Sequence, residues 1–137
     1  PAELGILANG SYRWKLMDYG GYGFGSYTDL QNFTLNIAPV SAVLGQPAGT
    51  LTSWDNAFQW TGVSGATWYY LEVQNSDGAV ILGKWYAASS ACTGTSCSLV
   101  PAELGILANG SYRWKLMDYG GYGFGSYTDL QDFTLNR

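Results

Sequence analysis

The sequence NGSYRWKLMD at residues 109–118 places a large apolar side chain at every second position. Tyr112, Trp114 and Leu116 therefore fall on one side of an extended chain, with basic residues between them. The same alternation recurs in residues 57–61, 67–74 and 131–135. A period of two over short segments predicts β-strands that are buried on one side only.

Turn residues separate these segments about every ten residues, which favours an all-β, antiparallel β-sandwich. The sequence Asn75-Ser-Asp-Gly78 predicts a tight hairpin between two of the strands. Residues 102–108 fit neither period, and we expect a bridging loop with about one helical turn that packs Leu104 or Leu107 under the sandwich.

A long internal repeat organises the chain. Residues 1–36 match residues 101–136 at 35 of 36 positions, the exception being Asn32 against Asp132. We therefore expect a tandem repeat with a period of 100 residues, in which residues 37–136 form one complete unit. Residues 1–36 would be the C-terminal strands of a preceding unit, and Arg137 either opens the next segment or ends the chain. The stretch can be a window on a longer array, or a subunit whose ends complete another chain.

Several motifs of the unit resemble fibronectin type III-like (immunoglobulin-like) domains of secreted bacterial proteins. Phe58-x-Trp60 followed by Val63-Ser-Gly-Ala66-x-x-Tyr69-x-Leu71-x-Val73 is similar to their strands B and C. Asn109-Gly-Ser-Tyr112-Arg-Trp114 with Phe133-Thr-Leu135 is similar to strands F and G. The resemblance implies a spacer, an adhesive unit or an accessory module of a surface protein or secreted enzyme.

The composition excludes several classes of protein. The chain is 47% hydrophobic and 16% aromatic, which is too rich in apolar surface for a disordered segment. Six basic residues against ten acidic ones leave no cationic stripe, so we expect neither nucleic acid nor anionic lipid as a partner. No apolar run approaches the ~20 residues that membrane insertion needs.

Cys92 and Cys97 are the only cysteines, and four residues separate them. A disulfide is the interpretation we favour over a free thiol pair or a metal site, because a metal would need further soft ligands and the chain has no His. The disulfide in turn predicts an extracellular or cell-surface location.

Aromatic residues outside the core pattern suggest a contact surface, because a cluster of large exposed rings marks an interaction site. The candidates are Trp54, Trp68, Tyr70, Trp85, Tyr86, Tyr119, Tyr122 and Phe124. Neighbouring copies of the unit are the partner we favour, which predicts a structural unit of a fibre or adhesin stalk. The alternative is a carbohydrate-binding accessory module whose rings stack on a glycan.

Enzymatic chemistry is not indicated. The carboxylates, Asp118 among them, show no paired spacing, and most are interpreted as solvated; no His is present to act as a general base. We expect no catalytic residue, no metal and no cofactor. The glycine-rich loop at residues 118–126 precedes a strand rather than a helix, so it is interpreted as a connection and not as a phosphate site. Asn9, Asn32 and Asn109 match the N-glycosylation pattern, although Asn-Gly is equally a turn signal.

Residues 1–36 pose a separate problem, since an isolated two-stranded hairpin is marginal in water. Its inward side chains would be Tyr12, Trp14, Leu16, Phe33 and Leu35. We expect another body to cover them, either in a preceding repeat or by strand exchange between chains. Exchange between identical chains need not close on itself, and it then builds a filament.

Overall fold

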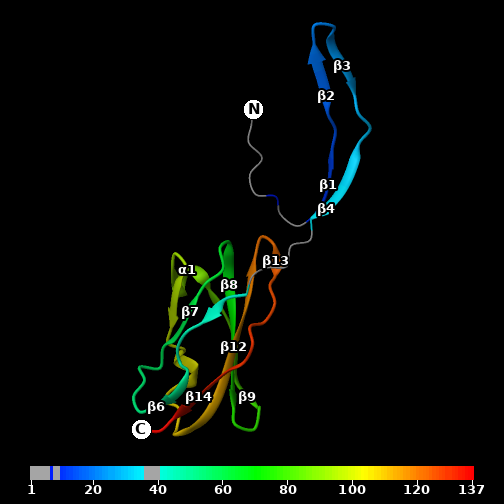
Figure 1. The fold of residues 1–137 in the computed structure, drawn as a ribbon. Coiled ribbons are helices and arrows are strands. Elements are labelled where there is room, and N and C mark those ends of the chain that lie inside the picture. The colour runs from blue at the N-terminus through cyan, green and yellow to red at the C-terminus, as the bar shows by residue number, and fades with distance from the viewer. Residues whose placement is uncertain (1–6, 8–9, 36–40) are drawn as a thin grey trace. The chain divides into compact units, whose positions relative to one another are not determined.

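Strands dominate the computed structural model, which describes residues 7, 10–35 and 41–137 (Figure 1). The chain divides into two units, Pro1–Ile37 and Ala38–Arg137. The strands of the first unit are β1 (Gly10–Trp14), β2 (Met17–Gly20), β3 (Gly23–Tyr27) and β4 (Gln31–Leu35). Those of the second are β5 (Val43–Leu44), β6 (Gly49–Leu51), β7 (Phe58–Thr61), β8 (Ala66–Asn75), β9 (Val80–Ala87), β10 (Cys92–Thr93), β11 (Ser96–Leu99), β12 (Gly110–Gly120), β13 (Gly123–Phe124) and β14 (Gln131–Leu135).

The second unit is a sandwich of two sheets. One sheet has the strand order β10-β11-β7-β5, and the other has the order β6-β14-β12-β8-β9, with β13 paired to β12. All pairings in these sheets are antiparallel except that of β14 with β6. The chain thus crosses between the two layers several times, for example from β5 to β6 and from β7 to β8, as in fibronectin type III-like and immunoglobulin-like sandwiches. The predicted fold class is confirmed.

The alternating residues of the facing strands fill the space between the two sheets. Phe58 and Trp60 enter the core from β7, while Trp114 and Leu116 enter it from β12. The other buried core positions that were predicted are Tyr69, Leu71, Val73, Phe133 and Leu135, whereas Tyr112 is only partly buried against the core. The period of two therefore identified the core correctly, because each of these strands has one face against the other sheet.

The predicted connections are present as well. The backbone N–H of Asn75 bonds to the carbonyl of Ala79, which closes the hairpin between β8 and β9. A single 3-10 turn, η1 (Ala102–Leu104), lies in the segment without strand period, and Leu107 behind it is buried. The short helix α1 (Ala88–Ala91) was not predicted, because four residues are too few to show a helical period.

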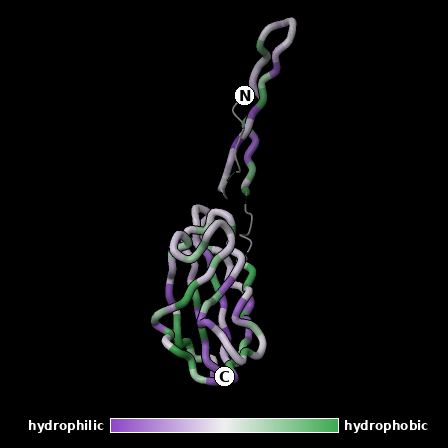
Figure 2. The backbone as a smooth tube through the Cα atoms, turned by 90° about the vertical axis from the view of Figure 1, so that its left-hand side faces the viewer, coloured by the Kyte–Doolittle hydropathy of each residue, from purple (hydrophilic) through white to green (hydrophobic). Residues whose placement is uncertain are grey.

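The first unit is a long two-stranded hairpin. β1 pairs with β4 and β2 pairs with β3, and Tyr12 lies opposite Phe33 just as Tyr112 lies opposite Phe133. Hydrophobic and hydrophilic residues alternate along its strands, as they do in the sandwich (Figure 2). Strand pairing in the hairpin is therefore the same as that of β12–β14.

Burial is what differs between the two copies of the sequence. Trp14 is 48% exposed where Trp114 is 0% exposed, and Leu16 is 60% exposed where Leu116 is 0% exposed. Phe33 is 39% exposed, whereas Phe133 is 1% exposed. Each of these side chains loses ~1.5–3 kcal/mol of stabilisation when it is left in water. That a further body covers them stays a prediction, as do the repeat boundaries, part of which fall in residues 36–40 outside the described part of the chain.

Candidate contact surface

Six aromatic rings cluster on the outer face of the larger sheet of the sandwich. The inward residues of β8 are Tyr69 and Leu71, so alternation turns Trp68 and Tyr70 outward. The other rings are Trp85 on β9, Tyr119 on β12, Phe124 on β13, and Tyr127 in the segment that leads to β14. We call these six residues the aromatic face.

The rings contact one another in a row across the strands. Trp85 is central, with ring-centroid distances of 5.2 Å to Tyr70, 6.5 Å to Tyr119 and 6.0 Å to Phe124. Tyr119 and Phe124 are cross-strand partners, and their centroids lie 4.8 Å apart. Such tilted and edge-on pairs are worth ~0.5–1.5 kcal/mol each beyond the area they bury, so the rings hold each other in place.

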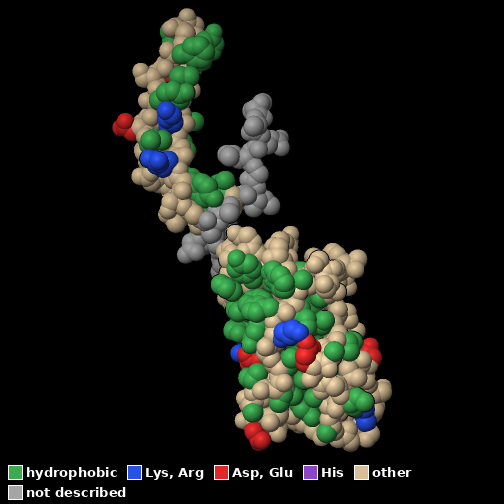
Figure 3. All heavy atoms as spheres, turned by 180° about the vertical axis from the view of Figure 1, so that it is seen from behind, with side chains coloured by type: hydrophobic (Ala, Val, Ile, Leu, Met, Phe, Trp, Pro, Cys, Tyr) green, Lys and Arg blue, Asp and Glu red, His purple; other side chains and the backbone are tan. Residues whose placement is uncertain are grey.

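A shallow depression lies in the middle of the aromatic face. It has a volume of ≈ 320 Å³ and is lined by Trp68, Trp85, Tyr119 and Phe124 alone. Hydrophobic side chains gather over the end of the sandwich where β13 lies (Figure 3). All four lining residues present rings, so the depression suits an apolar or ring-shaped contact and offers little for a strongly polar ligand.

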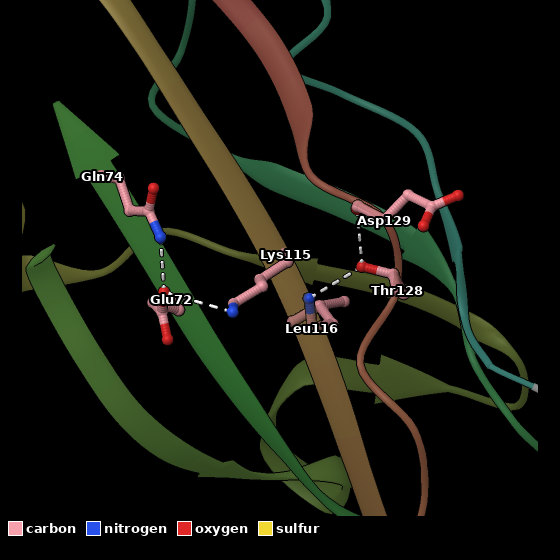
Figure 4. A network of polar contacts seen from close by, with 6 residues as sticks. All are labelled: Glu72, Gln74, Lys115, Leu116, Thr128 and Asp129. Atoms are coloured by element: carbon pink, nitrogen blue, oxygen red, sulfur yellow. Dashed lines mark hydrogen bonds and ion pairs between the residues drawn. The ribbon is translucent and has the colours of Figure 1, made fainter. Parts of the chain in front are cut away.

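Polar side chains occupy one edge of the aromatic face. The Lys115 ammonium lies 4.1 Å from the centroid of the Tyr127 ring and 3.5 Å from a carboxylate oxygen of Glu72. The Gln74 amide donates to the same Glu72 oxygen at 2.7 Å (Figure 4). Burial raises the pKa of Tyr127, and the Glu72 charge adds to the effect. This edge thus combines a cation, an anion and an amide beside an aromatic ring.

The sequence interpretation did not include this polar edge, although a signal for it was present. Glu72 and Gln74 continue the outward row of Trp68 and Tyr70 at steps of two residues, and Lys115 lies opposite Glu72 in the register. Strand parity alone therefore places them on the same side of the sheet as the aromatic face.

Three of the predicted surface residues lie elsewhere. Trp54 packs against Phe58 at 5.3 Å and Phe133 at 5.4 Å, because the segment before β7 folds over the end of the core. Tyr86 has the opposite parity to Trp85 and packs against the core. Its hydroxyl donates to Glu103 at 3.2 Å, and burial together with that bond raises its pKa to about 12.

Tyr122 is the third, and it points back toward the sheet. Its hydroxyl donates to the carboxylate of Asp118. Burial and the Asp118 carboxylate raise the pKa of the Tyr122 phenol. The structure thus keeps five of the eight predicted residues together (Trp68, Tyr70, Trp85, Tyr119 and Phe124).

Asp118 itself corrects the expectation that the carboxylates are solvated. It is 1% exposed, because it continues the inward row of Trp114 and Leu116. One of its carboxylate oxygens, Oδ1, is buried without a hydrogen-bond partner in the structure. A Cβ on Gly125 would come within 2.5 Å of that carboxylate, so glycine at 125 makes room for it.

The predicted disulfide joins Cys92 to Cys97, which are cross-strand partners in β10 and β11. Residues 10–35 and 41–137 contain no group of three or more His, Cys, Asp or Glu that could hold a metal ion. Within the same part of the chain, no helix is long and apolar enough to span a membrane.

The glycosylation candidates are placed as follows. Asn9 lies outside the described residues, and Asn32 is exposed on β4. The Asn109 side chain makes two bonds to the backbone of Arg137, donating at 2.9 Å and accepting at 3.0 Å. Asn109 thus ties the start of β12 to the end of the chain.

Comparisons with known proteins give structural likeness alone. No family model matches the chain, and no curated protein is similar to it in sequence. Domains d3–d4 of the rat CD45 extracellular region share 14% identity, with a TM-score of 0.48 over 98% of this chain and 68% of theirs. The FN1–FN3 domains of chicken CNTN1 share 10% identity, with a TM-score of 0.44 over 96% of this chain and 45% of theirs. The chain thus spans less than half of the CNTN1 fragment.

Proposed function

We propose that this chain is a non-enzymatic structural repeat unit of an extracellular fibre or cell-surface adhesin stalk. In this proposal, copies of the unit contact each other through the aromatic face. The observation that carries the proposal is the depression lined by four rings on the outer face of the larger sheet. Aromatic residues are enriched where protein surfaces meet, and charged residues are depleted there.

A second copy is the partner that fits this surface best. A repeated sequence presents the same surface on each unit, so every unit brings a matching face. An extracellular location agrees with the Cys92–Cys97 disulfide, since such bonds persist where the environment is oxidising.

Self-association of the full chain tests the proposal. We expect sedimentation velocity to show concentration-dependent assembly, and electron micrographs to show elongated particles. Trp68→Ser and Phe124→Ser should each weaken association at least tenfold. Ile106→Ser is the matched control, because Ile106 is 83% exposed yet lies outside the aromatic face. Equal association of all three variants would contradict the proposal.

A carbohydrate-binding module is the second candidate, and the polar edge at Lys115, Glu72 and Gln74 favours it. Ligand pockets typically pair apolar rings with a few such polar groups. Retention of the chain on an insoluble polysaccharide, lost in Trp68→Ala and Trp85→Ala, would support this candidate over the fibre.

A further inference from the structure

We infer that β1–β4 form a donor hairpin whose partner is the body of another copy of this chain, residues 41–99. In that body the donor takes the place that β12–β14 occupy in the sandwich. The inference rests on the proposed assembly of copies and deepens it, because it names a second contact with its own register and its own test.

The donor hairpin already has the geometry of its docked counterpart. The Tyr12 and Phe33 rings lie 5.5 Å apart at 25°, and those of Tyr112 and Phe133 lie 5.4 Å apart at 25°. The Leu16 N–H donates to the Thr28 hydroxyl at 3.0 Å, and the equivalent bond to Thr128 is 3.1 Å. A partner that needs little rearrangement loses little free energy to ordering when it binds.

The one sequence difference between the copies does not touch the docking side. Asn32 pairs with Arg13 in the hairpin, as Asp132 pairs with Arg113 in the sandwich. Both Asn32 and Asp132 are exposed, on the strand face opposite to Phe33 and Phe133. The donor therefore presents to a body the same side chains that β12–β14 present.

The body recognises specific polar groups of a docked hairpin. The Trp114 indole N–H donates to the Pro47 carbonyl at 2.9 Å. The Gln131 amide donates to the carbonyls of Gly45 at 2.7 Å and Pro47 at 2.9 Å. Trp14 and Gln31 are the same residue types at the equivalent positions of the donor. These bonds would fix which way the donor enters the body.

Apolar contacts supply the driving force. In the body, the Phe58 ring lies 5.1 Å from that of Trp114 and 6.3 Å from that of Phe133. The matching donor rings, Trp14 and Phe33, are 48% and 39% exposed. Docking would move these rings out of water, and burial of apolar surface is the dominant favourable term in association.

The short connection between the two units disfavours docking of the donor on the body of its own chain. Leu135 is opposite Gly110, and Gly125 bonds to Asp118, so the segment that docks spans eight residue steps of β12, or ~26 Å. Ser41 donates to Ser126, the residue after Gly125, at 3.4 Å.

A donor on its own body would need Leu35 and Ser41 to lie about that distance apart. Six residue steps cover at most ~22 Å, so Ser41 and the buried Ala42 would have to leave their places. A second chain has no such constraint.

Competition sets when exchange occurs. Each body is already filled by β12–β14 of its own chain, and exchange frees one hairpin for each one that docks. Tethering gives the resident hairpin an effective concentration in the millimolar range, so it wins in dilute solution. Weakening the resident hairpin should transfer the body to the donor of another chain.

A register-specific cross-link tests this. Lys115 pairs with Glu72, so Lys15→Cys and Glu72→Cys would face each other only where a donor is docked. With Leu116→Asp added to disable the resident hairpin, we expect oxidation to give a ladder of disulfide-linked multimers on a non-reducing gel. Adding Leu16→Asp to disable the donor as well should abolish the ladder.

The off-register control replaces Lys15→Cys with Arg13→Cys. Arg113 pairs with Gln74, so a cysteine at 13 would be two residues out of step with one at 72. We expect at least fivefold less ladder from this chain. Equal ladders, a folded Leu116→Asp chain without a ladder, or a cross-link within single chains would overturn the inference.

Two further variants make the outcome decisive. Should Leu116→Asp fail to fold, Trp114→Phe takes its place, because it removes the bond to Pro47 and part of a buried ring but keeps an aromatic side chain in the core. The ladder of this reporter must exceed that of the unweakened reporter. In the Leu116→Asp reporter, Trp68→Ser removes a ring of the aromatic face but keeps the core contacts of docking at Phe58, Pro47 and Gly45. Trp68→Ser can leave both the ladder and the sedimentation behaviour unchanged. That result would refute the proposed contact through the aromatic face, but it would not contradict hairpin exchange.

Discussion

The indole N–H of Trp114 donates a hydrogen bond to the Pro47 carbonyl, which ties the centre of β12 to the segment between β5 and β6. Trp14 has the same neighbours in sequence and the same position in its hairpin, but it is half exposed. The same residue in the same local sequence is thus buried at position 114 and half exposed at position 14. Substitutions at the two positions can therefore be compared directly.

Trp114→Ala should lower the free energy of unfolding of the sandwich by ~3–5 kcal/mol, because it opens a large cavity in the core. Trp14→Ala should change it by no more than ~0.5 kcal/mol in dilute solution, as is usual at exposed positions. Urea denaturation followed by circular dichroism measures both. Equal losses would show that Trp14 is covered even in single chains.

Gly125→Ala should destabilise the sandwich by ~1–3 kcal/mol, because its Cβ would collide with the buried Asp118 carboxylate. Gly121→Ala is the control in the same loop, since nothing lies within 4 Å of a Cβ at that position. Thermal unfolding of the two variants checks the prediction. A loss in Gly121→Ala as large as that in Gly125→Ala would point to backbone strain instead of the Asp118 contact.

Reduction of the Cys92–Cys97 disulfide should lower the free energy of unfolding by ~2 kcal/mol, near the low end for such bonds. The two cysteines have a sequence separation of only 5, so the bond closes a short loop and restricts the unfolded chain little. Unfolding of the wild-type chain with and without dithiothreitol measures the loss. The chain with both cysteines replaced by Ala should have the stability of the reduced wild type, and dithiothreitol should not change it.

Alkaline pH should destabilise the sandwich partly through Tyr86. Its pKa is raised from 10.0 to about 12 in the folded chain, so the unfolded chain releases the proton first. Stability is therefore complete below pH 10 and falls as the pH rises toward 12. Melting temperatures recorded from pH 8 upward should fall less steeply for Tyr86→Phe. Some slope should remain, because burial also raises the pKa of Tyr69 and Tyr122.

The fold followed from the sequence wherever one strand face is buried and the other is exposed. Tyr69 and Trp114 lie in the core because a step of two residues keeps a row of side chains on one side of a strand. The disulfide followed from the short spacing of Cys92 and Cys97. The split of strands between the two sheets depended on the resemblance, since alternation does not say which strands pair.

The candidate site was only partly predictable, because exposure depends on more than alternation. Trp54 precedes a strand and has no partner row, so its packing against Phe133 comes from the way the loop folds. Asp118 is two residues after Leu116, so strand alternation predicts an inward side chain, whereas its charge predicts exposure to solvent. The structure resolves that conflict with Gly125, whose missing side chain leaves space for a carboxylate.

The aromatic face is also shared between two parts of the sequence. Trp68, Tyr70 and Trp85 come from the body, whereas Tyr119, Phe124 and Tyr127 come from the hairpin that fills it. A body without a hairpin consequently displays half of the rings and two of the four residues that line the depression. In the proposed assembly, folding would then act as a checkpoint, because the complete aromatic face exists only after the sandwich is finished.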